Sequence, residues 1–431
     1  MFTPQRLFGE VGSSPDNLSY EPFLEHARIQ REQDRDVHAR LALGGYVVAR
    51  LVDKLLILGD DAELLDAFRW QLEAVKRHVE SLPADAPETA HLTGVVAAVP
   101  PGGAVASSLW KSLTAYAYFL EHEGRLEEAL EMVMLAARSQ GAHTAPPDFT
   151  GYALSAARLN RLLARWEVAT ECYQAAEEAA LWSSDLTRAL RARLGQAHVL
   201  RGRGNLPQAR EEIAEVISRA AAAGLPDVQA DGQQDLGVIL MLQGLRSESL
   251  EATYKAFTLA HDPVGRMRML GDLGCGLSES GHYEAARLAL EIVAASNASH
   301  HVKLNSLLEL MQLESAQGNR VAFERRRNEA KELVGRMTPS TAVDYRYKTA
   351  IGLARFGQVE RARQWLAEAL GIAEKDGLNQ WYFRLERMLK GLATANLDED
   401  EDIKAPSEAT PTPAVRDMAV GLREYASSAA V

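Results

Sequence analysis

The sequence has few cysteines, few aromatic residues and no long apolar run. Its 431 residues include only Cys172 and Cys275 as cysteines, which excludes a disulfide-built scaffold and indicates a reducing, cytoplasmic environment. No stretch is apolar and uncharged for the roughly 18 residues that a membrane span needs, and the first residues do not resemble a signal peptide. Aromatic residues make up 6%, whereas Ala, Leu, Arg and Glu are abundant, which favours helices over a β-sandwich.

Charge and motifs exclude several classes of function. The net charge of −12 argues against non-specific binding to nucleic acid or to an anionic membrane. The phosphate-binding loop, the zinc-protease signature, the C-x-x-C pair and the nucleophile elbow are all absent from the sequence. His300 and His301 are adjacent, so on a helix they would point about 100° apart and chelate a metal poorly. We therefore expect no catalytic residues, no metal and no cofactor.

A pattern recurs from residue 110 onward: an apolar helical stretch, a turn glycine, a large residue and then a small residue on a second helix. The small-residue positions lie 40, 40, 40, 37, 37 and 39 residues apart, at Ala129, Ala169, Ala209, Ser249, Ala286, Phe323 and Ala362. A turn glycine permits positive φ, and a small residue lets paired helices approach closely. Phe323 is bulky, and Met311 occupies the facing position, so we expect irregular packing in the sixth repeat.

The best copies of the repeat are Leu236-Gly237, and Leu273-Gly274 followed by Tyr283 and Ala286. This pattern resembles the tetratricopeptide repeat (TPR) family over residues 110–392, although the family period is about 34 residues. The longer period is similar to the sensor arrays of large bacterial transcription activators and peptide-pheromone receptors. The resemblance implies an all-α, right-handed solenoid of antiparallel helix pairs, whose first (A) helices line a concave groove and whose second (B) helices form the convex side.

The segments outside the array differ in composition. We predict an N-terminal helical hairpin from helices over 22–58 and 62–82, then a linker rich in proline and glycine. The predicted divisions are an N-terminal helical segment, a linker, about seven repeats, an acidic Pro-rich tether and an amphipathic tail, at 1–82, 83–106, 107–394, 395–415 and 416–431. We expect the tail to act as a tethered ligand, within one chain or between copies, steered by the acidic run toward a basic surface.

A local basic surplus stands out within this acidic chain. Residues 158–210 hold nine arginines against five acids, a surplus of four positive charges. The TPR register places the candidate ligand-binding residues on A helices, basic ones first and apolar ones after: Arg158, Arg161, Arg191, His198, Arg201, Val238 and Met241. Arginine binds carboxylates bidentately, so we predict a non-catalytic scaffold that binds an acidic peptide or protein segment in its groove. The alternative interpretation is that these arginines form a solvent-exposed face that binds no ligand.

Three alternatives are retained. The chain could be a peptide-sensing regulatory subunit that signals through the N-terminal hairpin. It could instead be a helical-repeat enzyme, or a subunit that recruits substrate to one. It could also be a homo-oligomeric scaffold in which the C-terminal segment docks on another copy. Neither a membrane nor a nucleic acid is expected as a partner.

Overall fold

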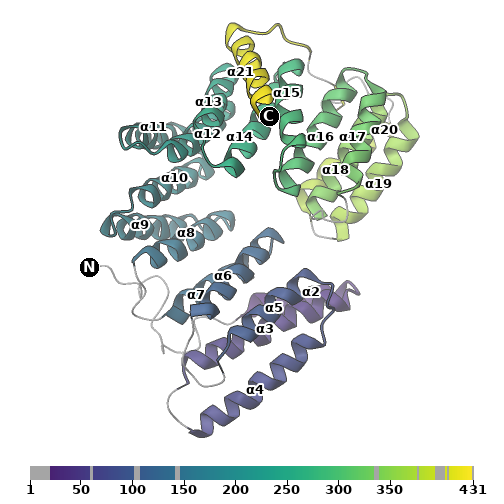
Figure 1. Cartoon of the computed structure of the whole chain (residues 1–431). Helices are drawn as coiled ribbons and strands as arrows, with labels where there is room; N and C mark the ends of the chain where they lie inside the picture. The colour runs from purple at the N-terminus through teal and green to yellow at the C-terminus, as the bar shows by residue number, and fades with distance from the viewer. Residues whose placement is uncertain are drawn as a thin grey trace. The chain divides into compact units, whose positions relative to one another are not determined.

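The computed structural model describes residues 20–58, 62–100, 107–140, 146–333, 339–375, 378–393, 403–404 and 407–429 (Figure 1). Every regular element in those ranges is an α-helix. The predicted all-α, TPR-like fold is confirmed. In the described ranges, no helix combines the length and hydropathy that crossing a membrane would demand. The predicted acidic run at 397–402 lies outside the described residues.

The chain forms two compact units, residues 1–212 and 213–431, which are treated separately below. The helices of the first unit are α2 (Glu21–Glu32), α3 (Asp36–Leu56), α4 (Ala62–Glu80), α5 (Pro87–Ala98), α6 (Ser107–His122), α7 (Leu126–Gln140), α8 (Pro146–Leu162), α9 (Trp166–Trp182) and α10 (Leu186–Gly202). Helix α11 (Leu206–Ala222) contains the boundary. The helices of the second unit are α12 (Pro226–Leu242), α13 (Arg246–Leu259), α14 (Pro263–Glu279), α15 (Tyr283–Ala295), α16 (His300–Ala316), α17 (Arg320–Lys331), α18 (Pro339–Arg355), α19 (Val359–Lys375), α20 (Asn379–Ala393) and α21 (Pro413–Ala429).

Helix pairs follow the predicted repeats. The pairs α6–α7, α8–α9, α12–α13, α14–α15, α16–α17 and α18–α19 pack as neighbours. Between the helices of a pair, the turn glycine takes a positive φ, such as 77° at Gly281 and 75° at Gly357. The small positions lie at the contact between paired helices, where the Ser249 hydroxyl donates to the Gly237 carbonyl at 2.8 Å. Local sequence signals therefore set the repeat architecture.

The N-terminal segment differs from the prediction in two places. The helix expected over 22–58 is divided into α2 and α3, because Asp34 adopts a left-handed conformation with φ 56°, which a short polar side chain tolerates. The linker expected over 83–106 contains α5. Pro87 lies in the first turn of α5, where proline is compatible with a helix, and Leu92 and Val95 are buried. Proline in this segment starts a helix instead of breaking one.

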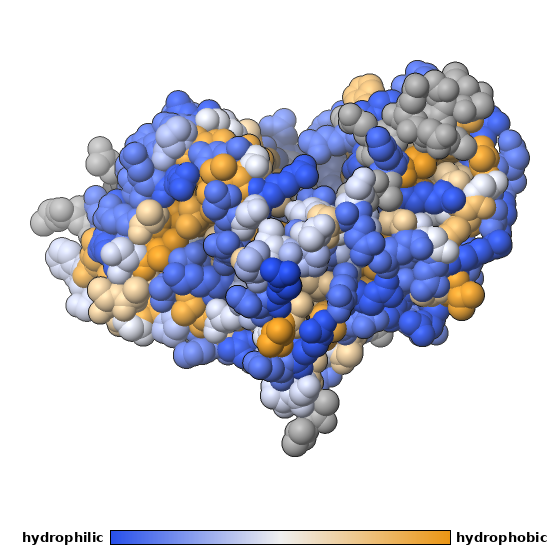
Figure 2. All heavy atoms as spheres, turned by 90° about the horizontal axis from the view of Figure 1, so that it is seen from above, coloured by the Kyte–Doolittle hydropathy of each residue, from blue (hydrophilic) through white to orange (hydrophobic). Residues whose placement is uncertain are grey.

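The surface carries scattered apolar residues among polar ones. Figure 2 shows that hydrophilic side chains cover much of the face in view, with hydrophobic patches between them. The exposed large apolar side chains of the described residues include Trp70 in the first unit and Val264 in the second. Apolar residues that are exposed singly are normal for folded proteins, so each needs a second observation before it indicates a binding site.

Candidate functional site

The sequence-predicted site residues divide between the two units. Arg158 and Arg161 lie on α8, and Arg191, His198 and Arg201 lie on α10, all within the first unit. Val238 and Met241 lie on α12, in the second unit. The five basic residues on α8 and α10 are called the basic A-helix surface from here on.

Tyr173 of α9 connects the two groups of basic residues. Its side chain hydrogen-bonds with Arg161, and the charge of Arg158 also acts on it. Burial raises the pKa of the Tyr173 hydroxyl, and both guanidinium groups oppose that rise. The Tyr173 ring lies against α10, because a Cβ added to Gly195 would come within 2.0 Å of it. Arg158, Arg161 and the middle of α10 therefore converge on one buried tyrosine.

Arg158 is held in place by an acid from the preceding repeat. Its Nη2 donates to Oε2 of Glu121 on α6 at 2.6 Å. The Arg158 side chain remains 41% exposed, whereas that of Glu121 is 16% exposed. The Nε atoms of Arg158 and Arg161 are buried, and no acceptor among the described residues bonds to either one. Buried donors usually have a partner, so these two Nε atoms are exceptions among the described residues.

The other members of the basic A-helix surface vary in exposure. Arg191 is exposed, and His198 and Arg201 are half-buried. Four further arginines of the 158–210 segment are paired with acids: Arg165 with Glu127, Arg188 with Asp185, Arg193 with Glu212 and Arg203 with Glu167. Pairing therefore neutralises part of the positive surplus of this segment.

Sequence reasoning missed Tyr173 and Glu121. Tyr173 lies on a B helix, so the register of the A helices gives no indication of it. One signal was present: Gly195 interrupts a helix, and a helical glycine often marks a close approach by another group. Glu121 lies 37 residues before Arg158, which is one repeat.

Charged side chains in the second unit are paired at the same one-repeat spacing. Lys348 of α18 donates to Glu309 of α16 at 2.6 Å and contacts Asp344 at 3.0 Å. Tyr347 and Ile351, which lie near Lys348 on α18, are buried in the hydrophobic core.

The two apolar candidates lie on α12. Val238 is 36% exposed and Met241 is half-buried. In the same unit, Cys275 of α14 is half-buried, and burial raises the pKa of its thiol well above the ordinary value. A thiol that stays protonated is a poor nucleophile, so Cys275 has the character of a packing residue and not of a reactive one. In the part of the chain that the structure describes, no three His, Cys, Asp or Glu side chains are grouped so as to hold a metal ion.

Antiparallel helix pairs, a period of 37–40 residues and turn glycines with positive φ define a TPR-like helical-repeat protein. Several solved structures are similar to the chain. The Rap conjugation gene regulator of plasmid pLS20, in complex with the Phr* peptide, is 12% identical, with a TM-score of 0.45 over 77% of this chain and 97% of that one. The apo form of the quorum sensor NprR from B. thuringiensis is 14% identical, with a TM-score of 0.42 over 87% and 97%. The apo form of RapI is 9% identical, with a TM-score of 0.43 over 62% and 98%.

Sequence comparison gives no closer assignment. No family model matches the chain, and no curated protein matches it.

Proposed function

We propose that this protein is a non-catalytic scaffold that binds an acidic peptide or protein segment on its basic A-helix surface. The observation that carries the proposal is the group of basic side chains on α8 and α10, in which the Arg158 side chain is 41% exposed and Arg191 is exposed. An arginine fork matches a carboxylate in shape and charge, so an acidic group of a ligand can pair with these exposed guanidinium groups. For Val238 and Met241, which lie on the second unit, we propose separately that they make apolar contacts with a ligand.

The surroundings of Arg158 support this role. Glu121 accepts from Nη2, which holds the guanidinium in one orientation before a ligand arrives. A pre-oriented arginine loses less side-chain freedom on binding. The same carboxylate repels an incoming acid, so affinity depends on the balance between the two effects.

Fluorescence anisotropy with labelled acidic-ended peptides tests the proposal. We expect binding that weakens as salt is added, and a loss of about tenfold or more in the Arg158→Glu/Arg191→Glu variant, since a charge-assisted hydrogen bond contributes about 1.5–3 kcal/mol. The Arg165→Glu/Arg203→Glu variant is the matched control, because both arginines are exposed and lie outside the basic A-helix surface. Equal binding by all three proteins at low salt would overturn the proposal.

A specific observation favours a second function, a sensor that transmits binding to the N-terminal helices. Arg138 of α7 pairs with Asp53 of α3 at 3.1 Å, and both side chains are almost wholly buried. His26 of α2 lies 3.1 Å from Glu128 of α7. Buried pairs of this kind are costly to separate, so the N-terminal helices follow any movement of α7. Hydrogen exchange of the amides in α2 and α3 should change when the acidic peptide binds. Unchanged exchange rates would contradict the sensor function and favour a scaffold that only binds the peptide.

We propose no catalytic residue, and recruitment of a substrate to an enzyme would use the same basic A-helix surface. Cys172 and Cys275 are both free thiols, which suits a reducing cytoplasm.

A further inference from the structure

Helix α21 returns to helices that precede it by more than a hundred residues. It follows the last helix of the array, yet it packs against α15 in the same unit (Figure 1). Val415, Met418 and Leu422 are buried in one hydrophobic cluster with Phe257 of α13 and helix α15. The Tyr425 ring packs edge-on against Phe257, with ring centroids 5.1 Å apart. These apolar positions form one face of α21, since they recur at intervals of three and four residues.

Polar contacts fix the orientation of this helix. Nη2 of Arg423 lies 2.5 Å from Oε1 of Glu284 on α15. The segment leading into α21 is also anchored, because the Ala409 amide donates to the Gly281 carbonyl at 3.1 Å. The acidic run that is predicted to steer the tail lies outside the described residues; within α21 itself, a basic residue contacts an acid of a B helix.

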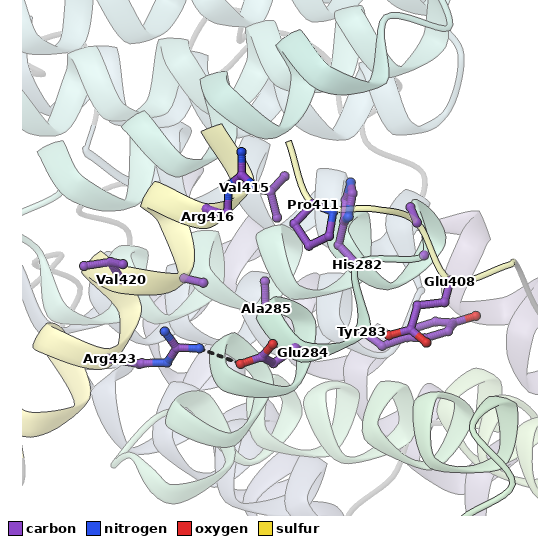
Figure 3. A pocket seen from close by; sticks show the side chains of 13 residues that line it. His282, Tyr283, Glu284, Ala285, Glu408, Pro411, Val415, Arg416, Val420 and Arg423 are labelled. Atoms are coloured by element: carbon purple, nitrogen blue, oxygen red, sulfur yellow. Dashed lines mark hydrogen bonds and ion pairs between the residues drawn. The ribbon is translucent and has the colours of Figure 1, made fainter. Parts of the chain in front are cut away.

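A pocket of about 270 Å³, open to solvent, lies between α21 and the start of α15 (Figure 3). Its lining is mixed: Ala285 of α15 and Val415 and Ala419 of α21 are apolar, whereas Glu284 and Arg423 form an ion pair at its side. A small side chain such as that of Ala419 makes few dispersion contacts across such a space. A residue larger than Ala419 would fill space that α21 leaves open.

Two features distinguish α21 from helices of the array such as α14, α16 and α18. Among the described helices it packs extensively on α15 alone, whereas each of those three packs on at least two others, and a pocket open to solvent lies beside its contact with α15. A tethered segment has a high effective concentration, so this limited packing is sufficient for it to remain bound within the chain. An untethered helix lacks that advantage and needs better packing to compete.

We propose that the surface of α13 and α15 beneath α21, called the α21 seat, is a docking site for an amphipathic helix of a partner protein. α21 is the built-in competitor for that site. The partner helix carries large apolar residues at the spacing of Val415, Met418 and Leu422, a residue larger than alanine at the position of Ala419, and a basic residue facing Glu284. This site lies on B helices and is distinct from the basic A-helix surface.

Trans binding to the full-length chain tests the inference. The probe is a fluorescent synthetic peptide with the sequence of residues 411–429 and the change Ala419→Leu. The Met418→Asp/Leu422→Asp chain, whose α21 can no longer bury its apolar face, should bind the probe about tenfold or more tighter than the wild-type chain. A variant that binds the probe no better than the wild type overturns the proposal, provided its circular dichroism matches.

Charge reversal tests the position of the probe. In the Met418→Asp/Leu422→Asp background, Glu284→Arg should lower the affinity of the chain for the probe. A probe that also carries Arg423→Glu should bind this variant with the original affinity. The same loss without recovery would place the probe elsewhere and contradict the α21 seat.

A third variant avoids any loss of folding. Ala419→Leu in the otherwise wild-type chain should fill the pocket, slow hydrogen exchange of amides 415–425 and weaken probe binding further. Faster exchange would show that the pocket cannot accept the side chain, and would contradict the proposed partner. A concentration-dependent dimer of the wild type that disappears in Met418→Asp/Leu422→Asp would mean that two copies exchange α21, which overturns the heterologous partner.

Discussion

The ring of Phe323 on α17 occupies the space in which Gly352 on α18 would otherwise carry a side chain. A Cβ added to Gly352 would lie 2.2 Å from Cε2 of Phe323. Phe323 is the one bulky residue at a position that is small in the other repeats, and it is fully buried, with an edge-on contact to Phe356 at 5.4 Å between centroids. The predicted irregularity of the sixth repeat is thus accommodated by a glycine in the next one.

Gly352→Ala is expected to destabilise the protein although alanine is the better helix former. The gain in helix propensity is about 1 kcal/mol, whereas overpacking costs about 1–3 kcal/mol. Gly371→Ala in α19 is the matched control, because nothing lies within 4 Å of its added Cβ, and we expect that change to stabilise the protein. Urea unfolding monitored by circular dichroism compares them; shifts of the same sign would contradict the packing argument.

The close approach of paired helices gives a second prediction. Ala286 on α15 is fully buried at the small position of its repeat, so Ala286→Phe should overpack the α14–α15 contact and lower the free energy of unfolding by about 3 kcal/mol. Ala295→Phe, at the exposed end of α15, should change it by no more than about 0.5 kcal/mol. Equal melting temperatures for the two variants would mean that the register of the helix pair is misassigned.

The sequence predicts those features of the fold that depend on neighbouring residues. Gly281, Tyr283 and Ala286 specify a turn and a helix contact within a few positions, so they are visible without a structure. The division at Asp34 and the start of α5 at Pro87 were missed because each residue is compatible with both a helix end and a loop. Whether a helix forms at such a point depends on burial of residues such as Leu92, which is decided by tertiary packing.

Contacts between repeats were harder to predict than the repeats themselves. The register correctly assigned Arg158 and Arg191 to A helices, yet the pairing of Arg158 with Glu121 and the position of Tyr173 involve other helices. Likewise, the apolar face of α21 was visible in the sequence, whereas its contact with Glu284, 139 residues from Arg423, was not. Charge counting along one segment ignores acids that pair from outside it.

A buried acid should make stability depend on pH near neutrality. Burial raises the pKa of Glu131 on α7 to about 7, and the charge of Glu127 adds to the rise. The folded state then holds this proton more tightly than the unfolded state, whose Glu pKa is about 4.3. The folded protein is therefore relatively favoured at low pH, and that contribution is lost as the pH rises through about 7.

Glu131→Gln tests this linkage. Removing the charge should raise the melting temperature more at pH 8 than at pH 5, where the native carboxyl is already mostly protonated. Glu178→Gln, an exposed change on α9, is the control and should shift the melting temperature little at either pH. A Glu131→Gln effect that is the same at both pH values would show that its carboxyl ionises normally.

Removing the charge of Glu121, which pairs with Arg158, should strengthen the binding of an acidic peptide and not weaken it. If the basic A-helix surface binds an acidic ligand, Glu121 competes with that ligand for the Arg158 guanidinium and repels it. Glu121→Gln keeps an oxygen that can accept from Nη2 but removes the negative charge. We expect the affinity for an acidic-ended peptide to rise by about two- to fivefold, because a partly exposed charge contributes up to about 1 kcal/mol. The affinity should also fall more steeply with added salt, since the surface gains one net positive charge.

Glu127→Gln is the control, because Glu127 pairs with the exposed Arg165 outside this surface. Weaker binding by Glu121→Gln would show that orientation of Arg158 by Glu121 outweighs the competition, and an unchanged affinity with an unchanged salt dependence would place the ligand away from Arg158.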